Sequence, residues 1–584
     1  MIARARTGRA LVLAALTAAL ASGAAAQRTL VSTPADLRAA IAGAQPGDTI
    51  ALANGTWTDV DIVFRADGTE ADSIRLEAET PGGVVLDGAS SLRIAGDYLV
   101  VDGLRFEGGT FSQGHLIQFR DGSRAAHHSR LTNTTVVDVG AVNPNVNTKW
   151  VSLYGTHNRV DHNYLAGKAN LGTTLVVWLE RGSSHQPTYH RIDRNHFGPR
   201  PPLGQNGGET IRLGTSDVSM QDAFVTVEEN LFERCDGEIE IISVKSGSNT
   251  LRRNTFLRSR GTLTLRHGNG SRVEGNVFLG QRVGDTGGVR IIGEDHVVVN
   301  NYFELLAGTG LRAAISIMNG VPNSPLNRYF QVRNVTVAHN TVVRARDALV
   351  IGAGADSERT LPPEDVRFHN NVLLSQGEKI VDLEAEPTGM TWDGTLYWGG
   401  SLGIDEPPGA TRVNPQIQPE AGETLWRPLP ESPILDAAVA IPGLDLATDI
   451  DGQARDATPD IGADERATSA VVFRPLTASD VGPSWSRATA GEPAGERSGS
   501  LRLGDPFPNP SAGAVSVPLT AAGDVEVTVV DARGRQVAVL FEGALAATHA
   551  LRLDTAGWAA GTYAVIARQG SAVARTSLTV LPPR

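Results

Sequence analysis

The segment CDGEIEIISVKS, residues 235–246, places two carboxylates one residue apart and a lysine shortly after them. In a strand, residues i and i+2 point to the same face, so we expect Glu238 and Glu240 to face outward together while Ile239 and Ile241 face the core. Two neighbouring carboxylates repel each other unless a cation lies between them, and Ca²⁺ binds six to eight oxygen ligands. The pair indicates a calcium site, with a solvated acidic strand face as the plainer alternative.

Two further oxygen donors occur upstream, in the segment QNGGETIRLG at residues 205–214. Asn206 and Glu209 precede Glu238 by 32 and 29 residues. A repeat of about this length would bring both side chains beside the acidic pair. Either residue is therefore a candidate for completing the ligand set.

The lysine of the first segment, Lys245, is an odd number of residues from Glu240. On an unbroken strand it would point inward, so we expect a corner between Ile242 and Lys245 to turn it outward. The alternative is an ordinary exposed lysine. Arg266 and His267 follow Lys245 by 21 and 22 residues, in the segment TLTLRHGN. That spacing predicts a lysine and an arginine side by side on adjacent repeats.

The next repeat would add Arg290 and His296, from the segment GGVRIIGEDH at residues 287–296. A column of such residues would bind a chain of carboxylates or sulfates. Each arginine taken alone is explained as well by a surface salt bridge.

A short phrase centred on asparagine recurs along the chain and predicts the scaffold for these residues. Its asparagines are Asn163, Asn195, Asn230, Asn254, Asn276, Asn301, Asn340 and Asn371. Between Asn230 and Asn301 they are 24, 22 and 25 residues apart, and the other steps are 31 to 39 residues. A period in the low twenties with Val- and Thr-rich segments predicts the stacked coils of a parallel β-helix.

In such a solenoid the asparagines are expected to stack as a ladder that hydrogen-bonds each coil to the next. A leucine-rich repeat has a similar period, but its helical segments are missing. Chance asparagines in the turns of a β-sandwich are the other alternative.

Both ends of the solenoid have candidate boundaries. Residues 33–57 begin with a short amphipathic helix whose Leu37, Ala40 and Ile41 share a face, which fits a cap on the first coil. Residues 449–465, DIDGQARDATPDIGADE, are expected to form the last coil. The chain then becomes rich in Ala, Ser, Gly and Pro, as in a linker, and its last part alternates like a small β-sandwich.

Composition narrows the function. The 584 residues carry a net charge of −12, which argues against a general nucleic-acid binder. Residues 1–26 contain three arginines, an apolar run and small residues, as in a secretory signal peptide; the run is short for a membrane anchor. Cys235 is the single cysteine, so no internal disulfide can form.

These segments, together with residues 147–179, resemble polysaccharide lyase family 6, which contains alginate lyases and chondroitinase B. The resemblance covers roughly residues 28–465. It implies a right-handed parallel β-helix and Ca²⁺-assisted β-elimination on an anionic uronate polysaccharide, with alginate as the expected substrate. A dermatan sulfate lyase and a non-catalytic glycan-binding β-helix remain alternatives. A glycoside hydrolase would need two carboxylates flanking the scissile bond, and Glu238 and Glu240 suit a cation better.

The resemblance also implies residue roles. Lys245 would be the general base and Arg266 the general acid, or Arg266 would stabilise the leaving oxygen while water supplies the proton, because arginine stays charged. The other roles are metal ligands and substrate contacts, respectively Asn206, Glu238 and Glu240 with Glu209 as a rival for Asn206, and His267, Arg290 and His296.

The tail resembles the C-terminal sorting domain of type IX secretion, through LRLGDPFPNPSAG at residues 501–513 and WAAGTYAV at residues 558–565. A carbohydrate-binding sandwich is the alternative, although the tail lacks an obvious aromatic platform. We thus expect a signal peptide at 1–26, a catalytic β-helix at 27–466, a linker at 467–500 and a sorting domain at 501–584. The protein would pass through the periplasm to a secreted or cell-surface location, with no membrane span and with the secretion machinery as a partner.

Overall fold

A computed structural model describes residues 26–485, apart from 111–113, 141–142, 183–184, 376–378 and 420–424. It also describes residues 502–581, apart from 504–505, 507–512, 522, 532, 534, 546–547 and 570–571. Residues 1–25 of the predicted signal peptide and residues 486–501 of the predicted linker lie outside the described part. The chain divides into two compact units, Met1–Trp485 and Ser486–Arg584.

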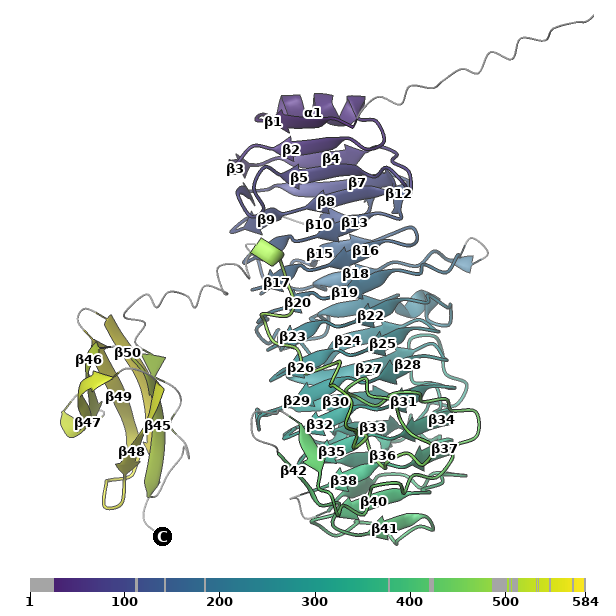
Figure 1. Ribbon diagram of the computed structural model, residues 1–584, viewed down its shortest axis with the longest axis vertical. Helices are drawn as coiled ribbons and strands as arrows, with labels where there is room; N and C mark the ends of the chain where they lie inside the picture. Colours follow the sequence, from purple (N-terminus) through teal and green to yellow (C-terminus); the bar gives the residue numbers. More distant parts are fainter. Residues whose placement is uncertain are drawn as a thin grey trace, which may run out of the picture. The chain divides into compact units, whose positions relative to one another are not determined.

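The first unit is a parallel β-helix, in which successive coils contribute strands to three long sheets (Figure 1). In hydrogen-bonded order, sheet A is β1 (Arg28–Val31), β2 (Thr49–Leu52), β5 (Ile74–Ala78), β8 (Leu99–Asp102), β13 (Arg130–Thr132), β16 (Arg159–Asp161), β19 (Arg191–Asp193), β22 (Thr226–Glu228), β25 (Thr250–Arg252), β28 (Arg272–Glu274), β31 (Val297–Val299), β34 (Arg333–Ala338) and β37 (Glu364–His369).

Sheet B follows the same order of coils. Its strands are β3 (Gly55–Thr58), β6 (Val84–Asp87), β9 (Leu104–Glu107), β14 (Thr135–Val137), β17 (Tyr164–Ala166), β20 (His196–Phe197), β23 (Leu231–Glu233), β26 (Thr255–Leu257), β29 (Val277–Leu279), β32 (Tyr302–Glu304), β35 (Thr341–Val343), β38 (Val372–Leu374), β40 (Thr395–Trp398) and β41 (Ala410–Arg412).

Sheet C carries the candidate site. Its strands are β11 (Arg120–Asp121), β12 (Arg124–His127), β7 (Ser91–Asp97) with β4 (Asp61–Arg65) beside it, β10 (Gly114–Gln118), β15 (Thr148–Leu153), β18 (Leu175–Val177), β21 (Ile211–Leu213), β24 (Glu240–Lys245), β27 (Gly261–His267), β30 (Thr286–Ile291), β33 (Ile315–Met318), β36 (Leu349–Ala353) and β39 (Val381–Leu383). Two 3₁₀ turns flank it, η2 (Ser216–Val218) and η3 (Gly310–Arg312).

The predicted asparagine ladder is confirmed. All eight asparagines are buried, and each side-chain amide from Asn163 to Asn340 donates to the amide oxygen of the next one at 2.9–3.0 Å. Each also donates to a backbone carbonyl, as Asn254 does to Val227 at 2.9 Å. The ladder thus satisfies polar groups that the turns bury, and it fixes the register of neighbouring coils.

The interior between the sheets is apolar and also stacked. Phe197, Phe232, Phe256, Phe278 and Phe303 form a column whose ring centroids are 4.5–4.9 Å apart. The column runs through sheet B, because each phenylalanine lies at the equivalent place of its strand. The large core thus stabilises the fold without a disulfide.

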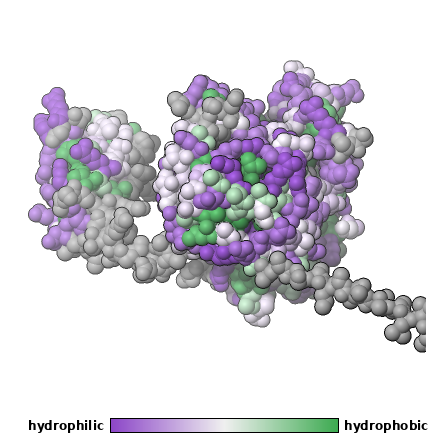
Figure 2. All heavy atoms as spheres, turned by 90° about the horizontal axis from the view of Figure 1, so that it is seen from above, coloured by the Kyte–Doolittle hydropathy of each residue, from purple (hydrophilic) through white to green (hydrophobic). Residues whose placement is uncertain are grey.

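The predicted cap is also present, as α1 (Pro34–Gly43) at the first coil (Figure 1). Thr33 is its N-cap and accepts a hydrogen bond from the Asp36 backbone N–H. Leu37 and Ile41 are buried, and Ala40 packs against the same core. Seen from this end, the surface is mostly hydrophilic with a few hydrophobic patches (Figure 2).

The predicted last coil is wrong. Residues 449–465 form no rung; they lie on the outer face of sheet B, where Ile450, Ile461 and Ala463 pack with outward-facing apolar residues of that sheet. The last rungs of sheet B are β40 and β41, and the short antiparallel pair β42 (Ile417–Pro419) and β43 (Trp426–Pro428) follows them. The segment is rich in Asp, Gly and Pro and lacks the β-branched run that a rung needs.

The first part of the predicted linker continues along the same β-helix. The Leu476 backbone N–H donates to Thr255, the Gly482 N–H to the Arg194 carbonyl, and the Trp485 indole to the Asn133 carbonyl. Residues 467–485 therefore contact the catalytic unit. Within the described residues no helix is long and apolar enough to span a bilayer.

The second unit consists of two small antiparallel sheets, as the alternation predicted. Their strands are β44 (Arg502–Leu503), β45 (Ala514–Thr520) and β48 (Thr548–Asp554) in one, and β47 (Gln536–Leu545), β46 (Gly523–Val530), β49 (Gly561–Gln569) and β50 (Ala572–Val580) in the other. They enclose a core that includes Val517, Val527 and Val565. The fold class, a parallel β-helix followed by a small β-sandwich, is thus confirmed.

Candidate active site

A groove of about 810 Å³ runs over the outer face of sheet C. Its floor is formed by side chains from the coils of β24, β27 and β30, among them Glu240, Lys245, Arg266 and Arg290. One wall consists of segments that precede the strands, such as 204–206 and 236–239, and the other contains residues 327–329. The solenoid therefore brings residues that are far apart in sequence into one cavity.

Two β-bulges aim the functional side chains. Between β24 and β27, Glu240 pairs with Thr262 but Ile242 pairs with Leu263, so Ile241 is an extra residue on β24. Val244 then pairs with Leu265 and Lys245 with His267, so Arg266 is an extra residue on β27. Bulges are common next to active sites because they redirect side chains.

The first bulge corrects two expectations about β24. Ile241 and Ile242 are both buried in the core, whereas Ile239 lines the groove beside the carboxylates. The change of phase occurs at Ile241, before the predicted corner between Ile242 and Lys245. Lys245 faces the groove as expected, but for this different reason.

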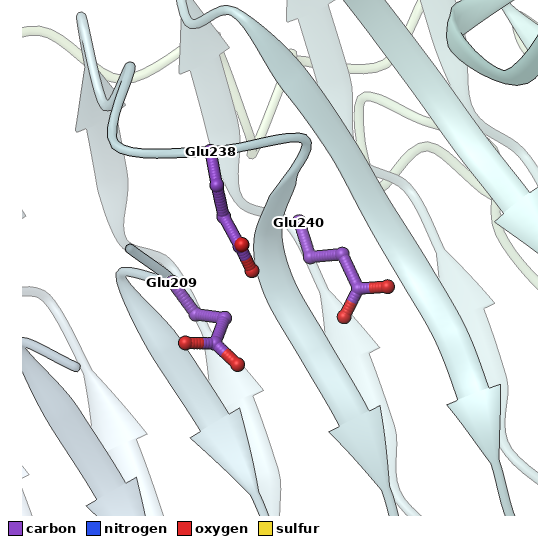
Figure 3. Close-up of side chains that lie close together, drawn as sticks. All are labelled: Glu209, Glu238 and Glu240. Carbon is purple, nitrogen blue, oxygen red and sulfur yellow. The ribbon is translucent and has the colours of Figure 1, made fainter. Parts of the chain in front are cut away.

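Three carboxylates converge at one end of the groove. Glu209 precedes β21, Glu238 precedes β24 and Glu240 begins β24 (Figure 3). Each offers an oxygen, and these oxygens all lie within 4.8 Å of one another. The spacing that suggested Glu209 as a rival ligand thus brought it beside the pair, and Asn206 lines the same groove.

Two glycines permit this close approach. A β-carbon on Gly208 would lie 2.5 Å from the Gly237 carbonyl oxygen, and one on Gly237 would lie 2.1 Å from the Gly208 carbonyl oxygen. The segments that carry Glu209 and Glu238 are therefore in backbone contact. Arg200, which is buried, ties the same region together through bonds to the carbonyls of Glu209 at 2.8 Å and Gly172 at 2.7 Å.

The carboxylates are incompletely satisfied by the described residues. Oε2 of Glu209 and Oε1 of Glu238 are buried and accept no hydrogen bond from them. Burial, together with the charges of Glu209 and Glu240, raises the pKa of Glu238 to about 8. Orphaned buried oxygens on three clustered acids fit a divalent cation with a preference for oxygen, which is the chemistry of Ca²⁺.

Positive side chains border the cluster on one side. Lys245 Nζ lies 3.5 Å from Glu209 Oε1, and Arg266 Nε lies 3.6 Å from Glu240 Oε1. Arg290 donates to the same Glu240 oxygen, and Ser243 donates to the other one. Burial opposes ionisation of Glu240, but Arg290 and Lys245 hold its pKa below the ordinary value.

The two predicted histidines have different surroundings. His267 pairs in register with Lys245, is buried and has no hydrogen-bond partner for either ring nitrogen among the described residues. Burial and the neighbouring Arg266 and Lys245 lower its pKa to about 2, so the ring is neutral. A neutral imidazole with unused nitrogens beside the groove is able to accept or donate a hydrogen bond.

His296 requires a correction. It is buried and does not line the groove; its Nδ1 accepts the Ser271 backbone N–H at 3.1 Å, and its Nε2 bonds to the Ile292 carbonyl at 3.0 Å. Both nitrogens are therefore used within the turn after β30. A turn histidine that caps backbone groups cannot also contact substrate.

The sequence interpretation missed an aromatic and basic strip that continues along sheet C toward α1. Tyr154 and Trp178, each just after a strand, stack with centroids 5.8 Å apart, and Arg120 lies 3.8 Å from the Tyr154 ring centre. They line a second hollow of about 740 Å³. Arg212 bridges the two hollows, 5.7 Å from the Trp178 ring and 3.9 Å from Glu209. Their 24-residue spacing, one coil, was the available signal.

Comparison with known proteins agrees with this geometry. Residues 31–378 match the family model described as chondroitinase B, and residues 506–580 match the secretion system C-terminal sorting domain. The sorting domain indicates export by type IX secretion to a secreted or cell-surface location. Among curated proteins no significant match is found.

Several solved structures are similar. The PL6 family alginate lyase AlyGC is 39% identical with a TM-score of 0.70; the match covers 78% of this chain but only 58% of that one. A mannuronic acid specific family 6 lyase from human gut microbiota is 32% identical, with a TM-score of 0.58 and coverage of 64% and 86%. Alginate lyase AlyF-OU02, solved with G6, is 26% identical, with a TM-score of 0.58 and coverage of 70% and 91%.

The carboxylate cluster, the basic residues beside it and the β-helix that aligns them thus coincide with a family match over more than half of the chain. The chain belongs to polysaccharide lyase family 6, the family of the chondroitinase B model.

Proposed function

We propose that this protein cleaves alginate by Ca²⁺-assisted β-elimination. The observation that carries the proposal is the contact between an acid cluster with unsatisfied oxygens and Lys245, with Arg266 on the next rung. Binding alone would need neither a base nor a metal-type cluster. Arrays of both are what elimination next to a carboxylate requires.

Lys245 is the proposed general base. It removes the proton at C5 of a uronate, the C4–C5 double bond forms from that electron pair, and the bond from C4 to the glycosidic oxygen breaks. The amine must be neutral to accept the proton, and the neighbouring Arg266 and Arg290 oppose an additional positive charge there. Arg266 stabilises the departing oxygen, which takes its proton from water or from the guanidinium.

The residues proposed to hold Ca²⁺ are Glu209, Glu238 and Glu240, with Asn206 as a further oxygen donor on the rim. A bound Ca²⁺ would neutralise the uronate carboxylate and favour the negative charge that develops beside it. Arg290 and Ser243 orient Glu240 for this role through its two oxygens. His267 supplies a neutral hydrogen-bonding group for the substrate, and Arg290 contributes positive charge to the floor.

Alginate is favoured over dermatan sulfate because several similar structures are described as alginate lyases. A sulfated substrate is the second candidate, since the matching family model is that of chondroitinase B. For the whole chain we propose a removable signal at 1–26, a catalytic unit at 27–466 whose continuation to Trp485 packs on it, and export directed by residues 501–584.

The test is incubation with alginate, its mannuronate and guluronate blocks, and dermatan sulfate, each with and without a calcium chelator. Unsaturated product is followed by the ultraviolet absorbance of the new double bond, and product size by chromatography. We expect chelator-sensitive absorbance with alginate. Product only from dermatan sulfate would favour the second candidate, and no product from any polymer would contradict a lyase function.

A further inference from the structure

A segment from a distant part of the chain forms the wall of the groove next to Arg266. It lies between β33 and β34, and its residues Asn327, Arg328 and Tyr329 line the groove. The two terminal nitrogens of Arg266 donate to the carbonyls of Arg328 at 2.8 Å and Asn327 at 3.4 Å. The guanidinium carbon lies 4.1 Å from the centre of the Tyr329 ring, a cation–π contact.

The Tyr329 ring is itself held in place. Arg359, which is ion-paired with Asp356, lies 5.2 Å from the same ring centre. The ring also packs against an apolar cluster on the outer face of sheet C, namely Ile292, Ala313, Met318, Val350 and Ala353. At its other end the segment is fixed by Ser219, which donates to the Leu326 carbonyl at 3.1 Å. Tyr329 therefore presents a fixed aromatic face to Arg266.

This contact opposes a competing position of Arg266. Its Nε lies 3.6 Å from Glu240 Oε1, an oxygen that Arg290 already occupies. Without the ring and the two carbonyls, the guanidinium would be drawn onto the carboxylate of Glu240. There it would face away from a departing oxygen and would compete with a cation for the same ligand.

We propose that Tyr329 is a positioning residue, which holds the Arg266 guanidinium over the groove and away from Glu240. The inference rests on the proposed function, because it assigns Arg266 to the departing oxygen. Arg266 keeps a second N–H on each terminal nitrogen after bonding to the carbonyls. Those two N–H groups are the ones available to substrate.

The test compares Tyr329→Phe, Tyr329→Leu and Tyr329→Ala in the full chain. Phe keeps the aromatic face, Leu fills the apolar contact without it, and Ala removes both. We expect kcat to fall at least about tenfold in the Leu and Ala variants with little change in KM, because misplacement of a reacting group affects the chemical step. The Phe variant should retain most of the wild-type kcat.

A second readout is independent of turnover. Titration calorimetry with Ca²⁺ alone should show affinity weakened by about tenfold in the Ala variant and unchanged in the Phe variant, as for other groups that orient ligands. Leu326→Ala, whose exposed side chain lies in the same segment, is the matched control and should behave as wild type. Melting temperatures show whether each variant is folded.

Each contrary result identifies its own failure. Loss of kcat in Tyr329→Phe equal to that in Ala would assign the effect to the hydroxyl, and full activity in Leu would remove the need for an aromatic face; either overturns the proposal. So does unchanged calcium affinity in a folded Ala variant. If wild type yields no unsaturated product, the proposed function fails, whereas the calcium titration still decides the position of Arg266.

Discussion

The β-helix unit contains two clusters of three carboxylates that differ in what surrounds them. Glu209, Glu238 and Glu240 form one, and Asp449, Asp451 and Asp464 form the other; in both, the oxygens lie within 4.8 Å of one another. In the aspartate cluster Arg427 Nη1 lies 2.6 Å from Asp451 and 2.5 Å from Asp464. Asp449 accepts backbone N–H groups from Asp451, Gln453 and Glu465 at 2.7–3.0 Å.

The glutamate cluster lacks such internal compensation. Its cations approach from one side, and Glu209 and Glu238 each retain a buried oxygen that the described residues leave unsatisfied. The comparison shows that proximity of acids does not define a metal site. What distinguishes the groove is charge that the protein has clustered without completing its neutralisation.

The largest expected contrast concerns the cation of each cluster. Lys245→Ala should reduce lyase turnover by about 10²–10⁴-fold, the contribution of a general base, without unfolding the chain. Absorbance of unsaturated product measures the first effect, and circular dichroism the second. Lys379→Ala, an exposed lysine paired with Asp382, is the matched control. Substantial turnover in Lys245→Ala would exclude the base assignment.

Arg427→Ala should instead affect stability. Removing it leaves clustered buried carboxylates without their partner, which typically lowers the free energy of unfolding by about 3–5 kcal/mol. Denaturant unfolding measures the change, with the exposed Arg38→Ala as a control. Turnover per folded molecule should be unaltered; a specific loss of turnover would show that the aspartate cluster also serves the reaction.

Neutralising one acid in each cluster sharpens the contrast. Glu238→Gln should weaken calcium binding by at least about 10–100-fold, since loss of a ligand exceeds the effect of an outer partner. Asp451→Asn should leave calcium binding in the groove unchanged. Calorimetric titration of both variants checks this pair, and equal losses would contradict the assignment of the cation to the glutamates.

The smallest effect is a pH dependence of stability that calcium does not alter. Burial and the charges of Asp451 and Asp449 outweigh Arg427 and raise the pKa of Asp464 from 3.8 to about 8. The folded state thus keeps a proton that the unfolded chain releases, so the free energy of unfolding should fall as pH rises between these values. Asp464→Asn should flatten that slope in thermal melts. A slope that persists unchanged would reject the assignment.

The sequence predicted much of the scaffold and the core of the site. The recurring asparagine phrase identified all eight members of the ladder, because a solenoid places equivalent residues of successive coils in contact. The same spacing brought Glu209 beside Glu238, and Lys245 into register with His267. Local pattern failed for His296 and for residues 449–465, because a capping histidine and an outer strap use the same residue types as a groove and a last coil.

By itself the sequence determined the coil period, the apolar interior and which charged residues would meet on one face. Those features follow from residue type and spacing, which a repeating backbone converts directly into contacts. Only the tertiary structure decided the bulges at Ile241 and Arg266, the aromatic strip at Tyr154 and Trp178, and the segment that brings Tyr329 to Arg266. These depend on one-residue shifts between strands and on contacts across more than sixty residues, which no periodic pattern encodes.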